Sequence, residues 1–356
     1  MILLGSTGSI GVNALIIAKR FNIEVEVLVA GSNITLLNQQ IEDFNPKFVV
    51  IADAKQSYLV NHKNVRAGKD AILDVIQEAQ SSLVVNALVG FLGLAPTLKA
   101  IECGKKIALA NKESLVAGGA FVDVSKIQPI DSEHFGLWYL LQDRPVSKMI
   151  ITASGGAFRD WDLDKLKHAT LAETQKHPNW SMGQKITIDS ATMVNKMFEL
   201  LEARWLFGEG NYDAVIETQS IVHALIDFKD GSTTAHFAYA NMQLPIAYAL
   251  DTKMQESILP SVDLLKLGNL NFKAIECDRY PVWEIKEDIL LNPHKGVIVN
   301  AANEAAIERF IAGKCGYLGI SETILKAYTH FDRQAKSVDE IFDIDSEVRK
   351  FVKNLS

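Results

Sequence analysis

The sequence predicts an α/β protein with an N-terminal doubly wound Rossmann-like domain, a central α+β catalytic domain and a C-terminal helical domain. Strands and helices alternate over the first 110 residues, and those strands are continuous apolar runs, as in parallel sheets buried on both faces. Strands of period-two character follow in the middle, and helical periodicity dominates the end. We expect domains at 1–118, 119–252 and 280–356, with a linker at 253–279.

The first domain has the order of elements that a parallel sheet requires. Each short apolar run is followed by an amphipathic segment, which is the pattern of a strand with a crossover helix. We expect strands at 1–4, 24–30, 48–51, 83–86, 106–110 and 127–130, and helices at 12–20, 36–44, 69–80 and 94–102.

A glycine-rich turn joins the first strand to the first helix. Gly5, Gly8 and Gly11 are spaced as GxxGxxG, a variant of the dinucleotide-binding pattern. Glycine lets the backbone approach a pyrophosphate closely, and a helix N-terminus supplies N–H groups and a positive dipole end. A tight turn without a ligand is the alternative, and the position at the start of a βαβ unit favours the cofactor.

The second strand ends in Gly31, Ser32 and Asn33, without the acid that would bind the ribose 2′-hydroxyl of NAD. Its absence favours NADP. However, residue 32 is not the basic side chain that would hold a 2′-phosphate.

Two more loops follow strands at the carboxyl edge of the sheet, where ligands bind in such folds. One contains Asn111, Lys112 and Glu113, and it is equally well explained as a capped helix start. The other contains Asp131 and Glu133, whose carboxylates suit a hard cation such as Mg²⁺ or Mn²⁺. An N-cap with an acidic first turn is the alternative there.

The sequence of the central region predicts a second sheet and two loops that could contact a substrate. Strands are expected at 147–153, 214–217, 224–228 and 233–240. After the first of them, Ser154-Gly155-Gly156 forms either a phosphate nest or an ordinary glycine turn. His177, Trp180 and Gly183 belong to a predicted flap at 177–183 that would exclude water over a substrate. A lone histidine is more often structural.

A helix is predicted to begin at Asp189 or Ser190 and to carry a polar stripe. Thr192, Asn195, Lys196 and Glu199 share one face of a mostly apolar segment. An ammonium, an amide and a carboxylate suit an anion beside a metal. A solvated face with a Lys–Glu pair is the alternative.

The C-terminal region reads as helices at 282–291, 295–312, 321–329 and 338–352, which we expect to buttress the site.

Composition limits the class of partner and the compartment. The 356 residues carry a net charge of −7 without a basic run, which argues against nucleic acid or an anionic membrane as partner. The three cysteines are far apart, as in a reducing cytoplasm. No apolar run reaches about 18 residues, and the first strand leaves no room for a signal peptide.

Together these features predict an enzyme with a cation, a nicotinamide and an anion site. Three carboxylates around Mg²⁺ would leave positions for two substrate oxygens, and the anion site would orient the substrate. Other Rossmann dehydrogenases, such as semialdehyde or homoserine types, would not need three acids. A dinucleotide-sensing regulator would not need the polar stripe.

Six motifs, GSTGSIG, ANKESL, DSEH, SGGAF, HPNWSMGQKITIDSATMVNK and NAANE, occur in this order. With them the chain resembles the 1-deoxy-D-xylulose 5-phosphate reductoisomerases over its whole length. The block from His177 to Lys196 is the most specific part.

The resemblance implies a role for each matching residue. The metal ligands would be Asp131, Glu133 and Glu199, and the cation Mg²⁺, Mn²⁺ or Co²⁺. The substrate-binding residues would be Ser132, Ser154, His177, Trp180, Ser190, Asn195 and Lys196. The NADPH contacts would be Thr7, Gly8, Ser9, Ile10, Gly31, Asn33, Asn111, Glu113, Gly183 and Met242. The catalytic group would comprise Lys112, Glu133 and His177, with proton transfer open between Lys112, Glu133 and a bound water.

The resemblance also implies the reaction and the assembly. A metal-assisted retro-aldol and aldol rearrangement would give 2-C-methylerythrose 4-phosphate. NADPH would then reduce this aldehyde to 2-C-methyl-D-erythritol 4-phosphate, in non-mevalonate isoprenoid synthesis. The small phosphorylated sugar would be the partner molecule, and the protein a homodimer.

Overall fold

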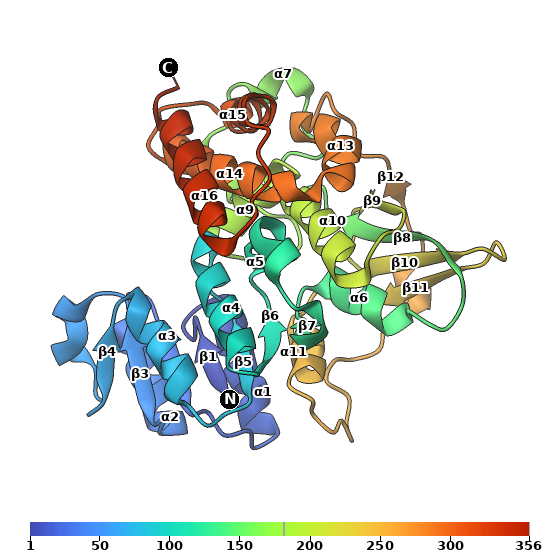
Figure 1. Ribbon diagram of the computed structural model, residues 1–356. Coiled ribbons are helices and arrows are strands. Elements are labelled where there is room, and N and C mark those ends of the chain that lie inside the picture. The colour runs from blue at the N-terminus through green and yellow to red at the C-terminus, as the bar shows by residue number, and fades with distance from the viewer. Residues whose placement is uncertain (181, 356) are drawn as a thin grey trace. The chain divides into compact units, whose positions relative to one another are not determined.

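The computed structural model describes residues 1–180 and 182–355, which form two compact units (Figure 1). Unit 1 comprises Met1–Ser114, Val122–Asp131 and Asn241–Leu259, and unit 2 comprises Leu115–Phe121, Ser132–Ala240 and Pro260–Ser356. Ser181 of the predicted flap and Ser356 of the predicted C-terminal domain lie outside the described residues.

Unit 1 is built on a seven-stranded sheet in the order β4-β3-β2-β1-β5-β6-β7. All neighbouring strands are parallel. The strands are β1 (Ile2–Leu4), β2 (Val27–Ala30), β3 (Phe48–Ile51), β4 (Val65–Ala67), β5 (Leu83–Asn86), β6 (Lys106–Leu109) and β7 (Ile127–Pro129). Six of these strands were predicted, and β4 was not.

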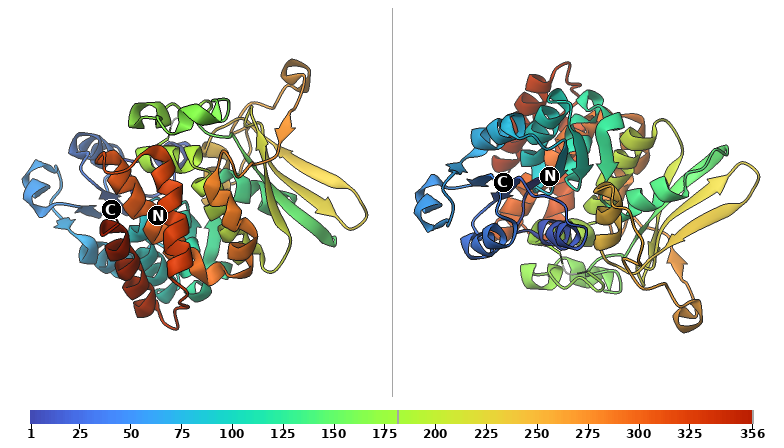
Figure 2. Two further views of the ribbon diagram at one scale, coloured as in Figure 1. Left: turned by 90° about the horizontal axis from the view of Figure 1, so that it is seen from above. Right: turned by 90° about the horizontal axis from the view of Figure 1, so that it is seen from below.

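Helices cover both faces of this sheet, so the doubly wound prediction is confirmed. α1 (Ser9–Arg20) and α2 (Ile34–Phe44) lie on one face, and α3 (Lys69–Glu78) and α4 (Leu94–Glu102) lie on the other (Figure 2). The core contains Leu3, Leu28 and Val85, all fully buried. This core places the glycine turn after β1 at the carboxyl edge of the sheet.

Unit 2 contains a five-stranded sheet in the order β11-β10-β8-β9-β12. Its strands are β8 (Val146–Ala153), β9 (Tyr212–Glu217), β10 (Val222–Phe228), β11 (Thr233–Phe237) and β12 (Phe272–Lys273). β8 and β9 are parallel, with Ala153 opposite Ile216, and the other pairs are antiparallel. The loops that follow β8 and β9 therefore leave the same edge, which brings Ser154 beside Thr218.

Helices of unit 2 carry six of the predicted site residues: Ser132, Glu133, Ser190, Asn195, Lys196 and Glu199. α6 (Ser132–Leu140) packs across β8, β10 and β11, and α10 (Val194–Phe207) packs against β9. At the end of the chain, α14 (Gly296–Ile311) packs with α15 (Tyr317–His330) and α16 (Val338–Lys353). Unit 2 also contains α7 (Leu163–Leu166), α8 (Leu171–Thr174), α9 (Gln184–Ala191), α12 (Leu264–Leu267) and α13 (Lys286–Leu291), and α5 (Lys112–Gly118) spans the boundary between the segments of the two units.

The prediction that a helix begins at Asp189 or Ser190 is wrong. Both residues lie inside α9, which begins after Gly183, and Met193 then breaks the chain with a φ of +66° before α10. The Asp189 carboxylate accepts hydrogen bonds from Lys185 and Asn303 at 2.7 Å each. It is therefore occupied within the core and does not cap a helix.

The segment 241–259 joins the first unit. It contains α11 (Gln243–Ala249), which packs against α1, and Gln243 Nε2 donates to Asn13 Oδ1 at 3.3 Å. Buried Ile246 and Leu250 complete the core of unit 1. The predicted boundaries at 118, 252 and 279 stay predictions, because the two units observed are each made of interrupted segments of chain.

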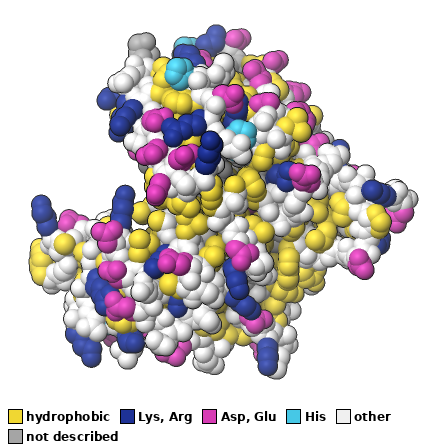
Figure 3. Space-filling model, in the orientation of Figure 1, with side chains coloured by type: hydrophobic (Ala, Val, Ile, Leu, Met, Phe, Trp, Pro, Cys, Tyr) yellow, Lys and Arg dark blue, Asp and Glu magenta, His cyan; other side chains and the backbone are white. Residues whose placement is uncertain are grey.

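Within residues 1–180 and 182–355, no helix has the length and apolar character needed to cross a bilayer. Basic and acidic side chains are interspersed over the face drawn in Figure 3. This agrees with the mixed signs of charge in the sequence.

Candidate functional site

Three carboxylates meet where α6 begins. One oxygen each of Asp131, Glu133 and Glu199 lies within 4.8 Å of the others. Asp131 is bonded directly to Ser132, the first residue of α6, and Glu133 lies in the first turn of that helix. Glu199 comes from α10 and is almost completely buried. The acidic first turn and the carboxylate cluster, two alternatives in the sequence, are both present.

Two lysines offset the negative charge of this cluster. Lys112 Nζ lies 2.8 Å from Asp131 Oδ2. Lys196 Nζ lies 3.6 Å from Glu133 Oε1 and also forms a close ion pair with Glu199. Both ammonium groups are buried, so these ion pairs are screened little by water.

Amide and hydroxyl donors hold the same carboxylates in place. Asn195 Nδ2 donates to Glu199 Oε1 at 2.6 Å, and Ser132 Oγ donates to Glu133 Oε2 at 2.8 Å. In the stripe, Lys196 and Glu199 are buried and Asn195 is half-buried, and all three take part in the contacts of the acidic cluster. The solvated-face alternative is wrong.

The donor set fits a divalent cation. Three carboxylate groups supply hard oxygen ligands, and they come from the residue before α6, the first turn of α6 and α10. Without a cation, three acids so close together repel one another, which is why lysines approach them. A cation such as Mg²⁺ would neutralise the same charges more directly.

The turn Ser154-Gly155-Gly156 follows β8 and is held closely against the end of α9. Gly155 and Gly156 have φ values of +86° and +67°, which favour glycine. A Cβ at Gly156 would lie 2.6 Å from the Ser190 carbonyl oxygen. Ser154 and Ser190, two predicted substrate-binding residues, therefore lie in backbone segments that touch each other.

His177 donates to Ser154. Its Nδ1 accepts from the backbone N–H of Asn179 at 3.2 Å and of Trp180 at 2.9 Å, so in the neutral ring Nε2 carries the hydrogen. That Nε2 lies 2.8 Å from Ser154 Oγ. Burial, helped by the nearby charges of Arg159 and Lys196, lowers the pKa of His177 to about 4. The ring is therefore neutral near pH 7.

The described part of the predicted flap is linked to the acidic cluster. Asn179 Nδ2 donates to the Thr218 carbonyl at 2.9 Å and to Ser220 Oγ at 2.7 Å. The Trp180 ring lies edge-on to His223, with centroids 6.3 Å apart. His223 Nδ1 in turn lies 3.7 Å from Glu133 Oε1.

In unit 1, the glycine turn has the geometry of a close-approach loop. A Cβ at Gly5 would meet the Ala87 carbonyl at 2.5 Å, and one at Gly11 would meet the Gly5 carbonyl at 2.2 Å. Gly8 is the N-cap of α1, and no side chain caps the described N-terminus of that helix. The N–H groups around Ser9 and Ile10 are thus suited to an anion.

Several predicted NADPH contacts also have structural roles. Asn33 caps α2 by accepting from Leu36 N at 3.2 Å. Asn111 donates to the carbonyls of Leu88 and Gly90 and accepts from Ser114 N, so it is the helix cap that the sequence allowed. All the predicted cofactor contacts stay predictions: Thr7, Gly8, Ser9, Ile10, Gly31, Asn33, Asn111, Glu113, Gly183 and Met242.

Sequence reasoning missed several residues around the site. His223 and Asn179 received no role, although His223 contacts Trp180 and Glu133 and Asn179 contacts His177. Tyr280 was also missed: it is 1% exposed, and its hydroxyl donates to the Gly155 carbonyl at 2.8 Å. Such contacts join residues up to 125 positions apart, and no local spacing signals them.

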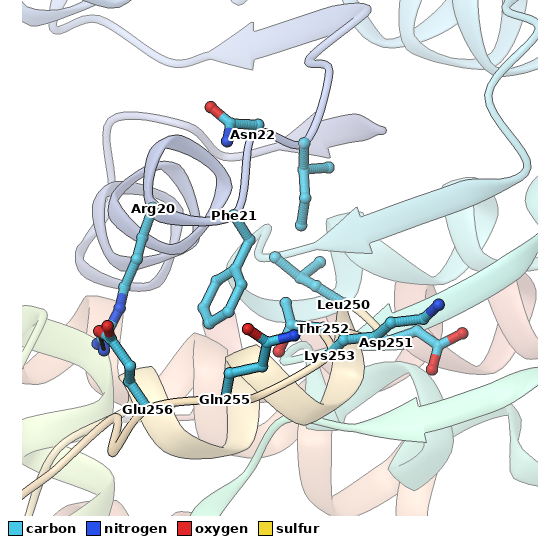
Figure 4. Close-up of a pocket in the computed structure, with 10 residues that line it drawn as sticks. Arg20, Phe21, Asn22, Leu250, Asp251, Thr252, Lys253, Gln255 and Glu256 are labelled. Carbon is cyan, nitrogen blue, oxygen red and sulfur yellow. Dashed lines mark ion pairs between the residues drawn. The ribbon is translucent and has the colours of Figure 1, made fainter.

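A separate pocket of about 640 Å³ lies in unit 1, between the end of α1 and the segment after α11 (Figure 4). Arg20 and Glu256 line it and form an ion pair at 3.6 Å. None of its lining residues is a predicted site residue.

Models of one protein family match most of the chain. The model described as 1-deoxy-D-xylulose 5-phosphate reductoisomerase matches residues 1–119. Two models of C-terminal domains of the same enzyme match residues 127–207 and 237–351.

Relatives carry the same description over their full length. The 1-deoxy-D-xylulose 5-phosphate reductoisomerase of Nautilia profundicola is 56% identical, with 99% of each chain covered. That of Wolinella succinogenes is 53% identical, with 100% of each covered.

Solved structures agree with the sequence matches. A DOX-P reductoisomerase in complex with NADPH, fosmidomycin and magnesium has a TM-score of 0.88 and 32% identity, covering 99% of this chain and 97% of that one. The Zymomonas mobilis enzyme in complex with NADPH has a TM-score of 0.88 and 31% identity, with 99% of each covered. By its sequence and its fold, this chain belongs to the 1-deoxy-D-xylulose 5-phosphate reductoisomerase family.

Proposed function

We propose that this chain converts 1-deoxy-D-xylulose 5-phosphate to 2-C-methyl-D-erythritol 4-phosphate with NADPH, as a step of non-mevalonate isoprenoid synthesis. Membership of the family supports this function. So do the related structures that hold NADPH and magnesium. The observation that carries the proposal is the convergence of Asp131, Glu133 and Glu199 within 4.8 Å.

The three carboxylates would hold a divalent cation, which when bound supplies Lewis acidity to two adjacent substrate oxygens. Ser132 and Lys112 would hold those hydroxyl and carbonyl oxygens. Lys112 is well suited to this, because its buried ammonium lies 2.8 Å from Asp131, beside the proposed cation. Fixed donors around the reacting oxygens stabilise developing charge without reorganisation.

The phosphate end of the substrate would bind to Ser154, Ser190, Asn195 and Lys196. Ser154 Oγ already accepts from His177 and from the Gly156 N–H at 3.1 Å, so its own hydrogen is directed elsewhere. A dianionic phosphate is a strong acceptor for that hydroxyl. Binding at this end would orient the carbon chain toward the carboxylate cluster.

His177 and Trp180 would cover the bound substrate. The neutral His177 ring donates to Ser154, and Trp180 rests against His223, so both are placed by contacts with the site. An aromatic cover excludes water and strengthens the polar interactions beneath it. The reduced coenzyme would bind at the glycine turn after β1 and deliver hydride to the aldehyde.

The test is NADPH oxidation followed by absorbance with 1-deoxy-D-xylulose 5-phosphate as substrate. After chelation of divalent ions the rate should fall to background, and added Mg²⁺ or Mn²⁺ should restore it. Undiminished turnover in the chelated enzyme would refute the cation's role. Absence of turnover with metal, NADPH and substrate all present would refute the function.

We also propose that the protein is cytoplasmic, as its widely spaced cysteines suggest, and a homodimer, as the family resemblance implies. Light scattering coupled to size exclusion should give twice the chain mass of 39.3 kDa. A mass of one chain would contradict the dimer.

A further inference from the structure

Two buried tyrosines from the C-terminal part of the chain contact the backbone of the proposed phosphate site. The Tyr280 hydroxyl donates to the Gly155 carbonyl at 2.8 Å, and the Tyr317 hydroxyl donates to the Ala191 carbonyl at 2.6 Å. Their exposed fractions are 1% and 2%. Neither tyrosine has a role in the proposed reaction.

The Tyr280 contact continues to the Ser154 hydroxyl through one peptide group. Gly155 C=O and Gly156 N–H belong to the same planar unit, so fixing one fixes the other. The carbonyl accepts from Tyr280, and the N–H donates to Ser154 Oγ at 3.1 Å. With His177 donating to the same oxygen, Ser154 Oγ is held from two sides.

The Tyr317 hydroxyl contacts the backbone at the end of α9, which lies against the turn 154–156. Ala191 is the last residue of α9 and follows Ser190, the second proposed phosphate ligand. The Tyr317 ring also packs edge-on against Phe158, with centroids 4.7 Å apart. The two segments touch at Gly156, where a Cβ would lie 2.6 Å from the Ser190 carbonyl oxygen and 2.7 Å from Ala191 Cα.

Both tyrosines are suited to remain donors. A buried phenol hydroxyl needs an acceptor, and a backbone carbonyl supplies one in each case. Burial raises the pKa of Tyr280 and of Tyr317 well above the usual range, so neither ionises at working pH.

We propose that Tyr280 and Tyr317 are positioning residues for the phosphate site, holding the Gly155 and Ala191 carbonyls so that the Ser154 and Ser190 hydroxyls face the substrate phosphate. This inference rests on the proposed function. It gives the C-terminal helical region a direct part in substrate affinity. Tyr280 and Tyr317 act through the backbone and do not themselves touch the phosphate.

The test uses Tyr280→Phe and Tyr317→Phe, which remove one hydroxyl each and keep the ring. Tyr212→Phe is the matched control, because the Tyr212 hydroxyl also donates to a glycine carbonyl, that of Gly208 at 2.7 Å, and the side chain is 5% exposed. Its partner, Gly208, belongs to neither segment of the phosphate site. All three variants lose a comparable buried hydrogen bond.

We expect Tyr280→Phe and Tyr317→Phe each to raise the KM for 1-deoxy-D-xylulose 5-phosphate by about 3- to 10-fold, the effect of one misplaced neutral hydrogen bond. The inhibition constant of inorganic phosphate should rise by the same factor. Both kcat and the KM for NADPH should stay within about 2-fold of the parent, because binding and not chemistry is altered. Tyr212→Phe should leave all four quantities unchanged.

Two results would overturn the proposal. One is a phosphate inhibition constant in both variants that matches Tyr212→Phe. The other is a parallel loss of kcat and NADPH affinity, which a merely structural role would produce. If the parent enzyme does not turn over the substrate, the proposed function fails, and calorimetric titration of inorganic phosphate into the parent and the variants still decides the positioning role.

Discussion

Gly156→Ala is the substitution whose effect follows most directly from the backbone of the site. Gly156 has a φ of +67°, and an added Cβ would meet Ser190 O at 2.6 Å and Ala191 Cα at 2.7 Å. Both neighbours are backbone atoms, which cannot rotate away. The substitution must therefore separate the strip 154–156 from the end of α9, and with it the two serines proposed to bind phosphate.

Gly231→Ala separates the steric effect from the conformational one. Gly231 has a φ of +87°, and nothing lies within 4 Å of its added Cβ. Both variants should lose about 1–2 kcal/mol because alanine disfavours positive φ, or about 2–8 °C of melting temperature in a unit of this size. Only Gly156→Ala carries the clash as well.

Steady-state kinetics and a thermal melt check this prediction. Gly156→Ala should raise the KM for 1-deoxy-D-xylulose 5-phosphate at least about 10-fold, the equivalent of about 1.4 kcal/mol, while the KM for NADPH holds. Gly231→Ala should lower the melting temperature without changing either KM. Equal kinetics in the two variants would refute the idea that contact at Gly156 shapes the phosphate site.

Three further predictions concern charges at the site. Glu133→Gln should abolish turnover and weaken Mn²⁺ binding in calorimetry, because one of three carboxylate ligands is lost. The affinity for NADPH should stay near that of the parent. A loss of NADPH affinity with intact Mn²⁺ binding would contradict the metal role. Lys196→Ala should raise the KM for the phosphorylated substrate by about 10-fold or more, because a buried charged donor is removed. An unchanged KM would exclude contact between Lys196 and the phosphate. His177, whose pKa is lowered to about 4, should titrate near that value by NMR, and the His177→Gln variant identifies its resonance by the loss of that signal. As pH falls, the unfolded chain takes up this proton near pH 6.5, before the folded chain does near pH 4. His177 should therefore lower the free energy of unfolding as pH falls from about 6.5 to 4 and have no such effect above 6.5. An NMR titration midpoint near 6.5 would contradict the burial of His177.

The Rossmann-like sheet could be predicted because its signals are local. β3, β5 and α4 have the predicted limits, since apolar runs bounded by turn residues identify buried parallel strands without reference to distant contacts. β4 was missed because its three half-buried residues, Val65–Ala67, include an arginine and form no apolar run.

The break between α9 and α10 could not be predicted from spacing. Methionine rarely adopts a positive φ, and Met193 does so at +66° while almost fully buried. Nearby, Asp189, which looked like a helix cap, instead accepts a hydrogen bond from Asn303, a residue 114 positions away. Tertiary contacts, which the local sequence does not reveal, outweigh local helix propensity here.

The site likewise contains residues that the sequence could identify and residues that it could not. Two of the carboxylates lie two residues apart in one loop, and Glu199 lies on the polar stripe of α10, so residue type and spacing pointed to a cation. For Ser154 and His177 the residues alone left the alternatives of a glycine turn and a structural histidine, and the family motifs decided for substrate binding. The supporting residues His223, Asn179, Tyr280 and Tyr317 carry no motif, and their contacts exist only in three dimensions.

Anomalous diffraction from crystals of this protein grown with Mn²⁺ tests the central claim most directly. The account predicts a strong peak within roughly 2.0–2.5 Å of carboxylate oxygens of Asp131, Glu133 and Glu199, and its loss in a Glu199→Gln variant. A peak bound elsewhere, or one that persists at full height in that variant, would contradict it.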